Sequence, residues 1–242
     1  MAEKGQESYR LDQYLQLAME VSRKEAGKII RNGWITVNGE EIRARDFKVS
    51  ESDQIEIDGE PLIYSSQPRY FMLYKPAGYV SSHRHDGHIS LFKLLENERA
   101  LERLHIAGRL DADTTGMVLI TDDGAWSHRV THPTDRASDD IEKVYEIELA
   151  RLMSSEMVAQ LEAGVELRGD DLITKPAKVE ILSEREIRLT LTEGRYHQVK
   201  RMLAAVGNHV ERLHRSQIGH LTLDGLREGE YRPLTEAEIK GF

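Results

Sequence analysis

The segment best suited to chemistry is a short, carboxylate-rich loop directly before an apolar run. Residues 108–116 read Gly-Arg-Leu-Asp-Ala-Asp-Thr-Thr-Gly, so two glycines enclose Arg109, Asp111 and Asp113. Loops held by rigid strands carry much of the chemistry of enzymes. The two carboxylates could serve as a nucleophile or general base, could bind a metal for phosphoester hydrolysis, or could only cap free backbone donors in a turn.

Calcium binding is one alternative for this loop. Five residues match template positions 1, 3, 5, 6 and 12 of the EF-hand loop, namely Asp111, Asp113, Thr115, Gly116 and Asp122. The template requires Glu at its last position and a helix on each side. Residues 117–121 are instead an apolar run typical of a strand. We therefore expect no calcium site.

Three histidines in residues 83–88, His-Arg-His-Asp-Gly-His, form a second candidate metal site. A closed site needs a fourth ligand and oriented partners for each histidine. Because this segment is polar, we expect exposed histidines, and we predict no bound metal here.

A helix is expected from residue 198 to Gly207. Its apolar stripe has the spacing i, i+3, i+4 and i+7, with Val199, Met202, Leu203 and Val206. At 100° per residue, Lys200 lies on the border of the stripe and Arg201 points away from it. Lys200 could reach a partly buried carboxylate or could only extend along the apolar surface, and Arg201 could meet a phosphate.

Two helices and a hairpin are predicted in the N-terminal part. Ser22 and Glu25 form a capping box at the start of the second helix, which ends near Gly33. Three basic residues share one stripe of this helix, opposite Ala26, Ile29 and Ile30: Lys24, Lys28 and Arg31. Strands are expected at residues 34–37 and 55–57, each followed by an Asn-Gly or Asp-Gly turn.

The rest of the chain alternates expected strands with short helices. Strands are predicted at residues 70–74, 117–121, 144–149 and 187–192, and a capped helix at residues 154–164. The predicted fold class is α+β. The predicted domains are a small module of residues 1–66 and a larger domain of residues 67–242.

Composition limits the class of protein. The 242 residues carry a formal net charge of -9 and no cysteine, which excludes disulfide scaffolds and cysteine nucleophiles. No apolar run approaches the roughly 18 residues that a membrane span needs. Positive charge is nevertheless concentrated locally: residues 22–31 contain four Lys or Arg and one Glu, and residues 195–215 contain five and one. Such patches suit an anionic partner, or they are only solvated helix faces.

Four motifs in order carry a family resemblance. Residues 108–116 resemble the catalytic loop of the RsuA/RluB branch of RNA pseudouridine synthases. Residues 75–78, 142–145 and 194–202 resemble the other motifs of that family. Residues 10–12 and 21–26 resemble the S4-like RNA-binding module that precedes its catalytic domain. The resemblance implies a catalytic domain built on a central, mainly antiparallel sheet.

The resemblance also implies roles for individual residues. Asp111 would be the nucleophile, Lys200 the cation beside it and Tyr145 the ring that packs on the target base. Leu189 or Leu191 would line the floor of the pocket. The residues implied in RNA binding are Arg10, Ser22, Arg23, Lys24, Lys28, Arg31, Arg109, Arg195, His197, Gln198 and Arg201.

Within this branch, residues 113–116, 122–129 and 230–235 most resemble the members that modify uridine 516 of 16S ribosomal RNA. We therefore expect 16S ribosomal RNA or a small-subunit assembly intermediate as partner, no cofactor, a monomer and a cytoplasmic location. Residues 83–88 and the acidic residues 135–140 depart from the family pattern. The alternative is a catalytically silent S4-type RNA-binding or ribosome-assembly factor, which would be expected to lack Asp111, Tyr145 or Lys200.

Overall fold

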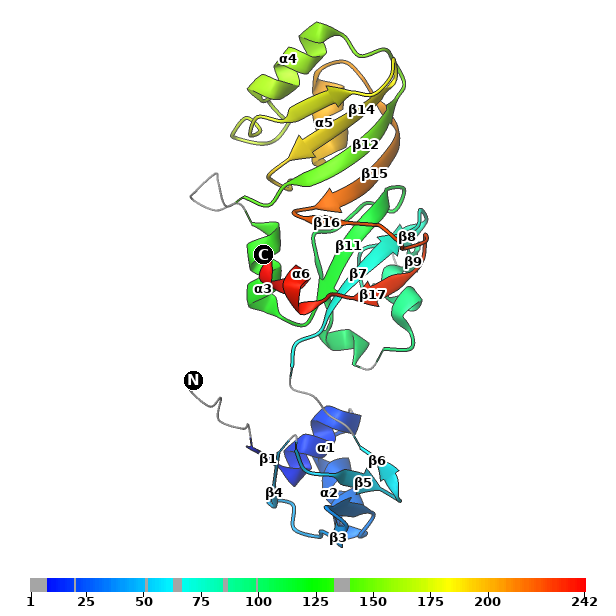
Figure 1. Ribbon diagram of the computed structural model, residues 1–242, viewed down its shortest axis with the longest axis vertical. Helices are drawn as coiled ribbons and strands as arrows, with labels where there is room; N and C mark the ends of the chain where they lie inside the picture. Colours follow the sequence, from blue (N-terminus) through cyan, green and yellow to red (C-terminus); the bar gives the residue numbers. More distant parts are fainter. Residues whose placement is uncertain are drawn as a thin grey trace. The chain divides into compact units, whose positions relative to one another are not determined.

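The computed structural model describes residues 8–19, 21–50, 52–62, 67–84, 87–98, 100–132 and 140–242. Residues 65–66 of the turn-rich stretch 65–68 that the sequence predicts as the connector lie outside these ranges. So do residues 85–86 of the histidine cluster and residues 135–139 of the acidic segment. The chain divides into two compact units, residues 1–67 and 68–242 (Figure 1). Among the described residues, no helix is long and apolar enough to cross a membrane.

The N-terminal unit packs two helices against short strands. Its elements are β1 (Ser8–Arg10), α1 (Leu11–Met19), α2 (Arg23–Arg31), β2 (Ile35–Val37), β3 (Glu40–Glu41), β4 (Lys48–Ser50), β5 (Ile55–Ile57) and β6 (Glu60–Pro61). The order β3-β2-β5-β6 forms an antiparallel sheet, and β1 pairs with β4. The predicted capping box of Ser22 and Glu25 is confirmed. So is the turn at Asn38 and Gly39, whose φ angles of 52° and 84° suit a hairpin that follows the twist of its strands.

The larger unit contains the remaining helices and strands. They are β7 (Tyr70–Lys75), β8 (Tyr79–Val80), β9 (Ile89–Ser90), η1 (Leu91–Leu95), η2 (Leu101–Arg103), β10 (His105–Ala107), β11 (Thr115–Thr121), α3 (Gly124–Thr131), β12 (Lys143–Leu149), α4 (Ser155–Ala163), β13 (Lys178–Ile181), β14 (Glu186–Leu191), α5 (Gln198–Ala205), β15 (Val210–Ile218), β16 (Leu221–Thr222), β17 (Tyr231–Pro233) and α6 (Glu236–Lys240). The predicted strands and helices of this region are confirmed, with ends shifted by one or two residues.

A nine-stranded sheet organises this unit, and its main order is β13-β14-β12-β15-β11-β7-β17. The described neighbouring strands pair antiparallel except β11 and β15, which run parallel. The expected α+β fold with a mainly antiparallel sheet is confirmed. The parallel ladder contains only two residue pairs, Thr115 with His214 and Gly116 with Arg215. The first half-sheet consists of β13, β14, β12 and β15, and the second consists of β11, β7 and β17. The two half-sheets meet along the short seam between β15 and β11.

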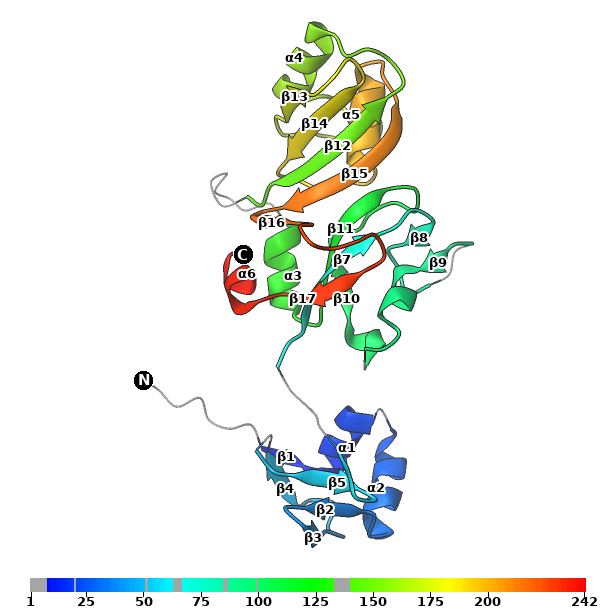
Figure 2. The same ribbon diagram turned by 45° about the vertical axis from the view of Figure 1, so that its right-hand side comes forward.

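Helices cover the sheet on both faces. On one face, Leu161 of α4 and Leu203 of α5 pack with Ile147 and Leu189 of the first half-sheet. Figure 1 shows α5 behind β12 and β14. On the opposite face of β7 and β11, Trp126 of α3 packs with apolar residues of both strands. Figure 2 shows α6 beside α3, where the Trp126 indole donates to the Ile239 carbonyl at 3.1 Å.

Gly116 allows the two half-sheets to meet. Its φ is +114°, and a Cβ at this position would lie 2.3 Å from the carbonyl oxygen of Arg215. That is too close for any side chain, and the positive φ itself favours glycine. The glycine that closes the carboxylate-rich loop therefore sets the contact between β11 and β15.

Candidate active site

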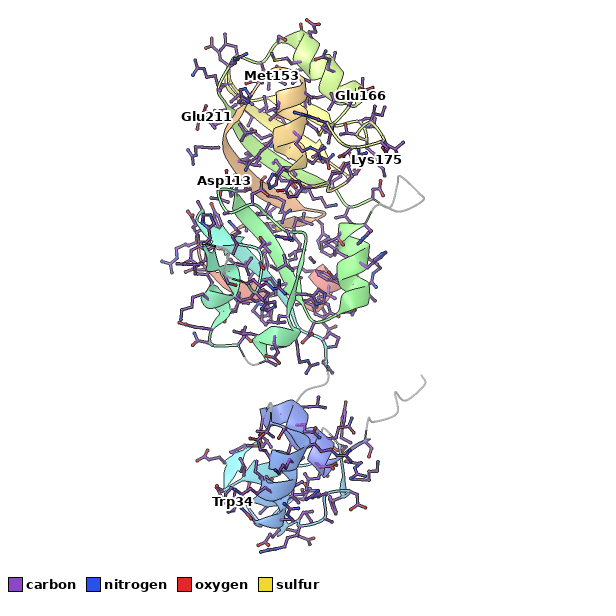
Figure 3. All side chains as sticks on the ribbon, turned by 180° about the vertical axis from the view of Figure 1, so that it is seen from behind. Trp34, Asp113, Met153, Glu166, Lys175 and Glu211 are labelled. Atoms are coloured by element: carbon purple, nitrogen blue, oxygen red, sulfur yellow. The ribbon has the colours of Figure 1, made fainter. Side chains whose placement is uncertain are left out.

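A cleft of about 1200 Å³ opens along the seam between the half-sheets. Its walls include the loop of residues 108–114, the start of β12, the end of β14 and the segment that leads into α5. Figure 3 labels Asp113, which lies where β11 meets β15. Several residues predicted from the sequence line this cleft together: Arg109, Asp111, Tyr145, Leu191, His197 and Lys200.

Asp111 lies between two nitrogen donors. Lys200 Nζ is 2.9 Å from its Oδ2 atom, and His197 Nε2 is 3.2 Å from its Oδ1 atom. The Asp111 side chain keeps about 25% of its exposure, so it is accessible from the cleft. His197 reaches this position because it adopts a left-handed backbone conformation, with φ 47°, immediately before α5. The helix-border position of Lys200 thus brings its ammonium to a carboxylate.

Lys200 is shared between two carboxylates. Its Nζ atom also lies 2.6 Å and 2.9 Å from the two oxygens of Asp113. The hydrogen bond from Lys200 lowers the pKa of Asp113. Burial acts to lower the pKa of Lys200, but its hydrogen bonds to Asp113 and Asp111 outweigh this effect and raise it. Asp113 is therefore an ion-pair partner of Lys200, beyond the turn-capping role considered from the sequence.

A buried lysine, Lys75, donates hydrogen bonds to the backbone of the carboxylate-rich loop. Lys75 is fully buried, and its Nζ atom donates to the carbonyls of Pro76 at 2.8 Å, Ala112 at 3.3 Å and Thr114 at 2.7 Å. Burial lowers the pKa of Lys75 to about 8. Nothing in the residue pattern predicts this role, although Lys75 opens one of the family motifs. Its three bonds fix the backbone on both sides of Asp113.

Tyr145 and Arg215 form the opposite wall. They face each other across β12 and β15, and the Arg215 guanidinium carbon lies 6.0 Å from the centre of the Tyr145 ring. Arg215 is 2% exposed and donates to the carbonyls of Met117 at 2.9 Å and Gly108 at 2.7 Å. It therefore links β15 both to β11 and to the start of the loop. Sequence reasoning counted Arg215 only as part of a basic patch.

Of the two leucines predicted for the pocket floor, one is in place. Leu191 lines the cleft at the end of β14. Leu189 was wrong as a pocket residue: it is fully buried in the apolar core and does not line the cleft. The two share a face of β14, but a step of two residues moves a side chain about 6.6 Å along a strand.

Three residues predicted to contact RNA have partners within the protein. Arg195 bonds Glu193 and the carbonyls of residues 172 and 173. Arg201 bonds Asp170 at 2.6 Å, and the buried Gln198 amide bonds Glu193. These contacts brace the loop of residues 166–173 against α5. Arg201 points away from the apolar stripe, but it meets a carboxylate of the protein there.

The predicted residues of the N-terminal unit fall into two groups. Arg10 bonds both carboxylate oxygens of Asp12, at 2.9 Å and 3.1 Å, Arg23 lies 3.6 Å from Asp12, and the Ser22 hydroxyl is used in the helix cap. The other three are exposed on one stripe of α2: Lys24, Lys28 and Arg31. As predicted, the opposite side of α2 is buried at Ala26 and Ile30 and half-buried at Ile29.

The EF-hand alternative from the sequence does not have the required geometry in the structure. Residues 115–121 form β11, and Asp122 bonds the backbone and side chain of Arg69, so this segment is not an EF-hand loop. In the described part of the histidine cluster, His83 Nε2 lies 2.8 Å from the Leu104 carbonyl, and its ring stacks on Phe92. No group of three or more His, Asp or Glu side chains that could hold a metal ion occurs among the described residues.

Comparison with known proteins defines the class. A sequence model of the RNA pseudouridylate synthase family matches residues 69–205, and a model of the S4 domain matches residues 10–55. A crystal structure of a pseudouridylate synthase is similar with a TM-score of 0.67 and 44% identity, covering 96% of this chain and 98% of that one. The chain therefore belongs to the RNA pseudouridylate synthase family, whose members are isomerases of RNA, and it carries an S4 domain at its N-terminus.

Two curated relatives carry the same name. The chain is 48% identical over 231 residues to ribosomal small subunit pseudouridine synthase A of Escherichia coli strain K12, covering 95% of this chain and 98% of the relative. It is also 48% identical over 233 residues to the protein of that name from Vibrio parahaemolyticus, covering 95% and 97%. The family resemblance found in the four motifs is confirmed.

Proposed function

We propose that this protein converts one uridine of 16S ribosomal RNA, the equivalent of uridine 516, into pseudouridine, with Asp111 as the nucleophile. The names of the relatives support the small-subunit substrate. The observation that carries the proposal is the pairing of Asp111 with Lys200 at 2.9 Å in a cleft that also contains Tyr145. An RNA-binding factor without catalytic activity would not require Asp111, Lys200 and Tyr145 together in one cleft.

The isomerisation breaks the N1–C1′ bond of the nucleoside, turns the base and forms a C5–C1′ bond. One proton leaves C5 and one is gained at N1, so the balance requires no oxidant, reductant or added water. Attack on the sugar, attack on the ring and assistance to elimination all require an ionised carboxylate. The Lys200 ammonium lies 2.9 Å from Asp111 and places an opposite charge beside the carboxylate.

Tyr145 faces the same cleft and is 8% exposed, so its ring offers a flat surface for the target base. Its hydroxyl is our candidate for removing the C5 proton. The target base must leave the stack to reach this position, at a cost of a few kcal/mol. Contacts to RNA phosphates offset that cost. In the proposal they come from Arg109, which is exposed at the cleft, and from the basic stripe of α2.

The S4-type module of residues 1–66 and the catalytic domain of residues 67–242 divide the work in this proposal. The module holds the RNA through Lys24, Lys28 and Arg31, and the domain carries the reaction. A monomeric state and a cytoplasmic location stay predictions of the sequence.

The decisive test is Asp111→Asn, assayed on unmodified 16S ribosomal RNA and on small-subunit assembly intermediates. Carbodiimide mapping of the wild-type reaction should show one new pseudouridine. The variant should lose at least about 10³-fold in rate, because a nucleophile has no substitute in the site. Its RNA affinity should stay within about twofold, because binding rests on other residues. Pseudouridine formation by the variant at the wild-type rate would exclude Asp111 as nucleophile.

The same assay in the presence of a chelator distinguishes the proposed isomerase from a metal-dependent enzyme. A metal-dependent phosphoesterase built on Asp111 and Asp113 would lose its activity in EDTA and would cleave the RNA. We expect intact RNA and unchanged pseudouridine formation in that buffer.

A further inference from the structure

A second lysine of the cleft is buried without a partner. Lys143 is the first residue of β12 and is 6% exposed. It pairs with Leu191 on β14 and with Ile218 on β15, and all three residues line the cleft. Tyr145 lies two residues further along the strand, so both side chains face the same side of the sheet. The ammonium of Lys143 and the ring of Tyr145 therefore share one cleft.

The charged groups around Lys143 are used elsewhere. Arg215 on β15 and Lys175 repel it, while Asp140 and Glu193 attract it. Asp140 forms an ion pair with Lys175. Glu193 accepts hydrogen bonds from Arg195, from Gln198 and from the Lys175 backbone. Within the described residues, the ammonium of Lys143 has no hydrogen-bond or ion-pair partner.

Lys143 is 6% exposed and its ammonium is not among the fully buried unpartnered atoms, so it reaches solvent only through the cleft. Such a position is unfavourable for a charge, because most of its water is lost without an anion in return. Burial and the nearby Arg215 lower the pKa of Lys143 to about 8, so most molecules still carry the charge at pH 7. Arg215 is also desolvated, and its guanidinium bonds only carbonyl oxygens among the contacts described above. Two adjacent cations that lack a carboxylate form a place for an anion supplied by a ligand.

We propose that Lys143, supported by Arg215, binds a backbone phosphate next to the extruded uridine and so positions that nucleotide against Tyr145. This inference rests on the proposed function, since RNA supplies the anion. The uracil ring is uncharged at neutral pH, so the phosphates carry the formal charge of the nucleotide. A compact ammonium suits a single phosphate oxygen without requiring the planar geometry of a guanidinium. Lys143 is thus a positioning residue.

The test compares Lys143→Met with Lys178→Met, which removes the same charge from an exposed position on β13. Lys143→Met should weaken binding to 16S ribosomal RNA by about tenfold, as expected for loss of a charged hydrogen bond. The slope of log affinity against log salt should become shallower by about 0.7–0.9, the value for one phosphate contact. Lys178→Met should change neither quantity.

Thermal unfolding separates this role from a structural one. Since Lys143 has no partner to lose, Lys143→Met should melt at the wild-type temperature or above it. A variant that melts lower and keeps the wild-type salt slope would overturn the proposal.

Two further binding experiments use only the wild-type protein. Affinity should fall between pH 8 and pH 9 as Lys143 loses its proton, because the neutral amine attracts phosphate less. RNA joined from synthetic pieces with methylphosphonates at the two phosphates flanking the target uridine should bind more weakly and lose this pH dependence. Equal pH dependence with both RNAs would contradict phosphate binding by Lys143. Wild-type protein that leaves small-subunit RNA unmodified would instead refute the proposed function.

Discussion

Two lysines that line the cleft are in opposite situations. Lys200 lies between Asp111 and Asp113 and is neutralised within the protein. Lys143 lies beside Arg215 and faces no free carboxylate among the described residues. The first arrangement pairs the ammonium with carboxylates of the protein, and the second leaves a charge available for a ligand. The difference shows that the role of a lysine in the cleft follows from its partner more than from its burial.

Among changes to the lysines, the largest effect should come from removing the paired Lys200. Lys200→Met leaves Asp111 and Asp113 facing each other with no ammonium between them. The two carboxylates then repel each other, and Asp111 loses the ion pair that holds it in the cleft. We expect kcat to fall about 10²–10³-fold, the scale of losing one electrostatic contact in an active site, measured by single-turnover pseudouridine formation.

The double variant Lys200→Met with Asp113→Asn is the matched control. Removing the second carboxylate should restore part of the rate. No recovery would show that Lys200 acts on the substrate rather than on the charge of Asp111.

A third lysine sharpens the comparison, because Lys75 is buried like Lys143 but fully bonded. Lys75→Met removes three charged hydrogen bonds and leaves carbonyls at residues 112 and 114 without that donor. We expect the free energy of unfolding to fall by about 2–4 kcal/mol. Urea denaturation followed by tryptophan fluorescence measures it, with Lys143→Met as the control that should lose nothing. Equal losses in both variants would remove the distinction between them.

The basic stripe of α2 shows how much affinity comes from outside the cleft. Replacing Lys24 and Arg31 with Glu reverses two exposed charges without disturbing the buried side of the helix. RNA affinity should weaken about tenfold through lost phosphate attraction, while kcat at saturating RNA stays at the wild-type value. Filter binding and saturation kinetics separate the two quantities. Unchanged affinity would reduce the N-terminal unit to a scaffold.

The smallest expected effect is the pH dependence of stability. Lys75 and Lys143 have pKa values of about 8 in the folded protein, against 10.5 for an ordinary lysine. Between these values the unfolded chain binds more protons, so stability without RNA should rise from pH 8 to pH 9.5. Lys143→Met should reduce this rise by an amount on the order of 1 kcal/mol. Urea midpoints at three pH values provide the measurement, and a flat wild-type profile would contradict it.

Periodicity predicted the elements and the directions of several side chains. The apolar stripe of α5 predicted the border position of Lys200, which depends only on the geometry of one helix and its repeat of 3.6 residues. The place of Tyr145 in the site followed from the family motif. The two residues line the same cleft as Asp111, whose part in the site followed from its loop and the family motif.

Partners contributed by distant loops could not be predicted in this way. Arg201 does point away from the apolar stripe of its helix, but the sequence does not predict that its side chain bonds Asp170. The backbone carbonyls that bind Lys75 and Arg215 have no sequence signature, because every residue has one. His197 contacts Asp111 only through a left-handed backbone conformation that a helical projection does not describe.

Gly116 has a consequence for the tolerance of the cleft to change. The wall bearing Asp111 and the wall bearing Tyr145 meet through a ladder of two residue pairs, where the main chains of Gly116 and Arg215 are in direct contact. A methyl group at residue 116 would collide with the Arg215 main chain and push β11 and β15 apart. The width of the cleft between Asp111 and Tyr145 therefore depends on the absence of a side chain at this one position.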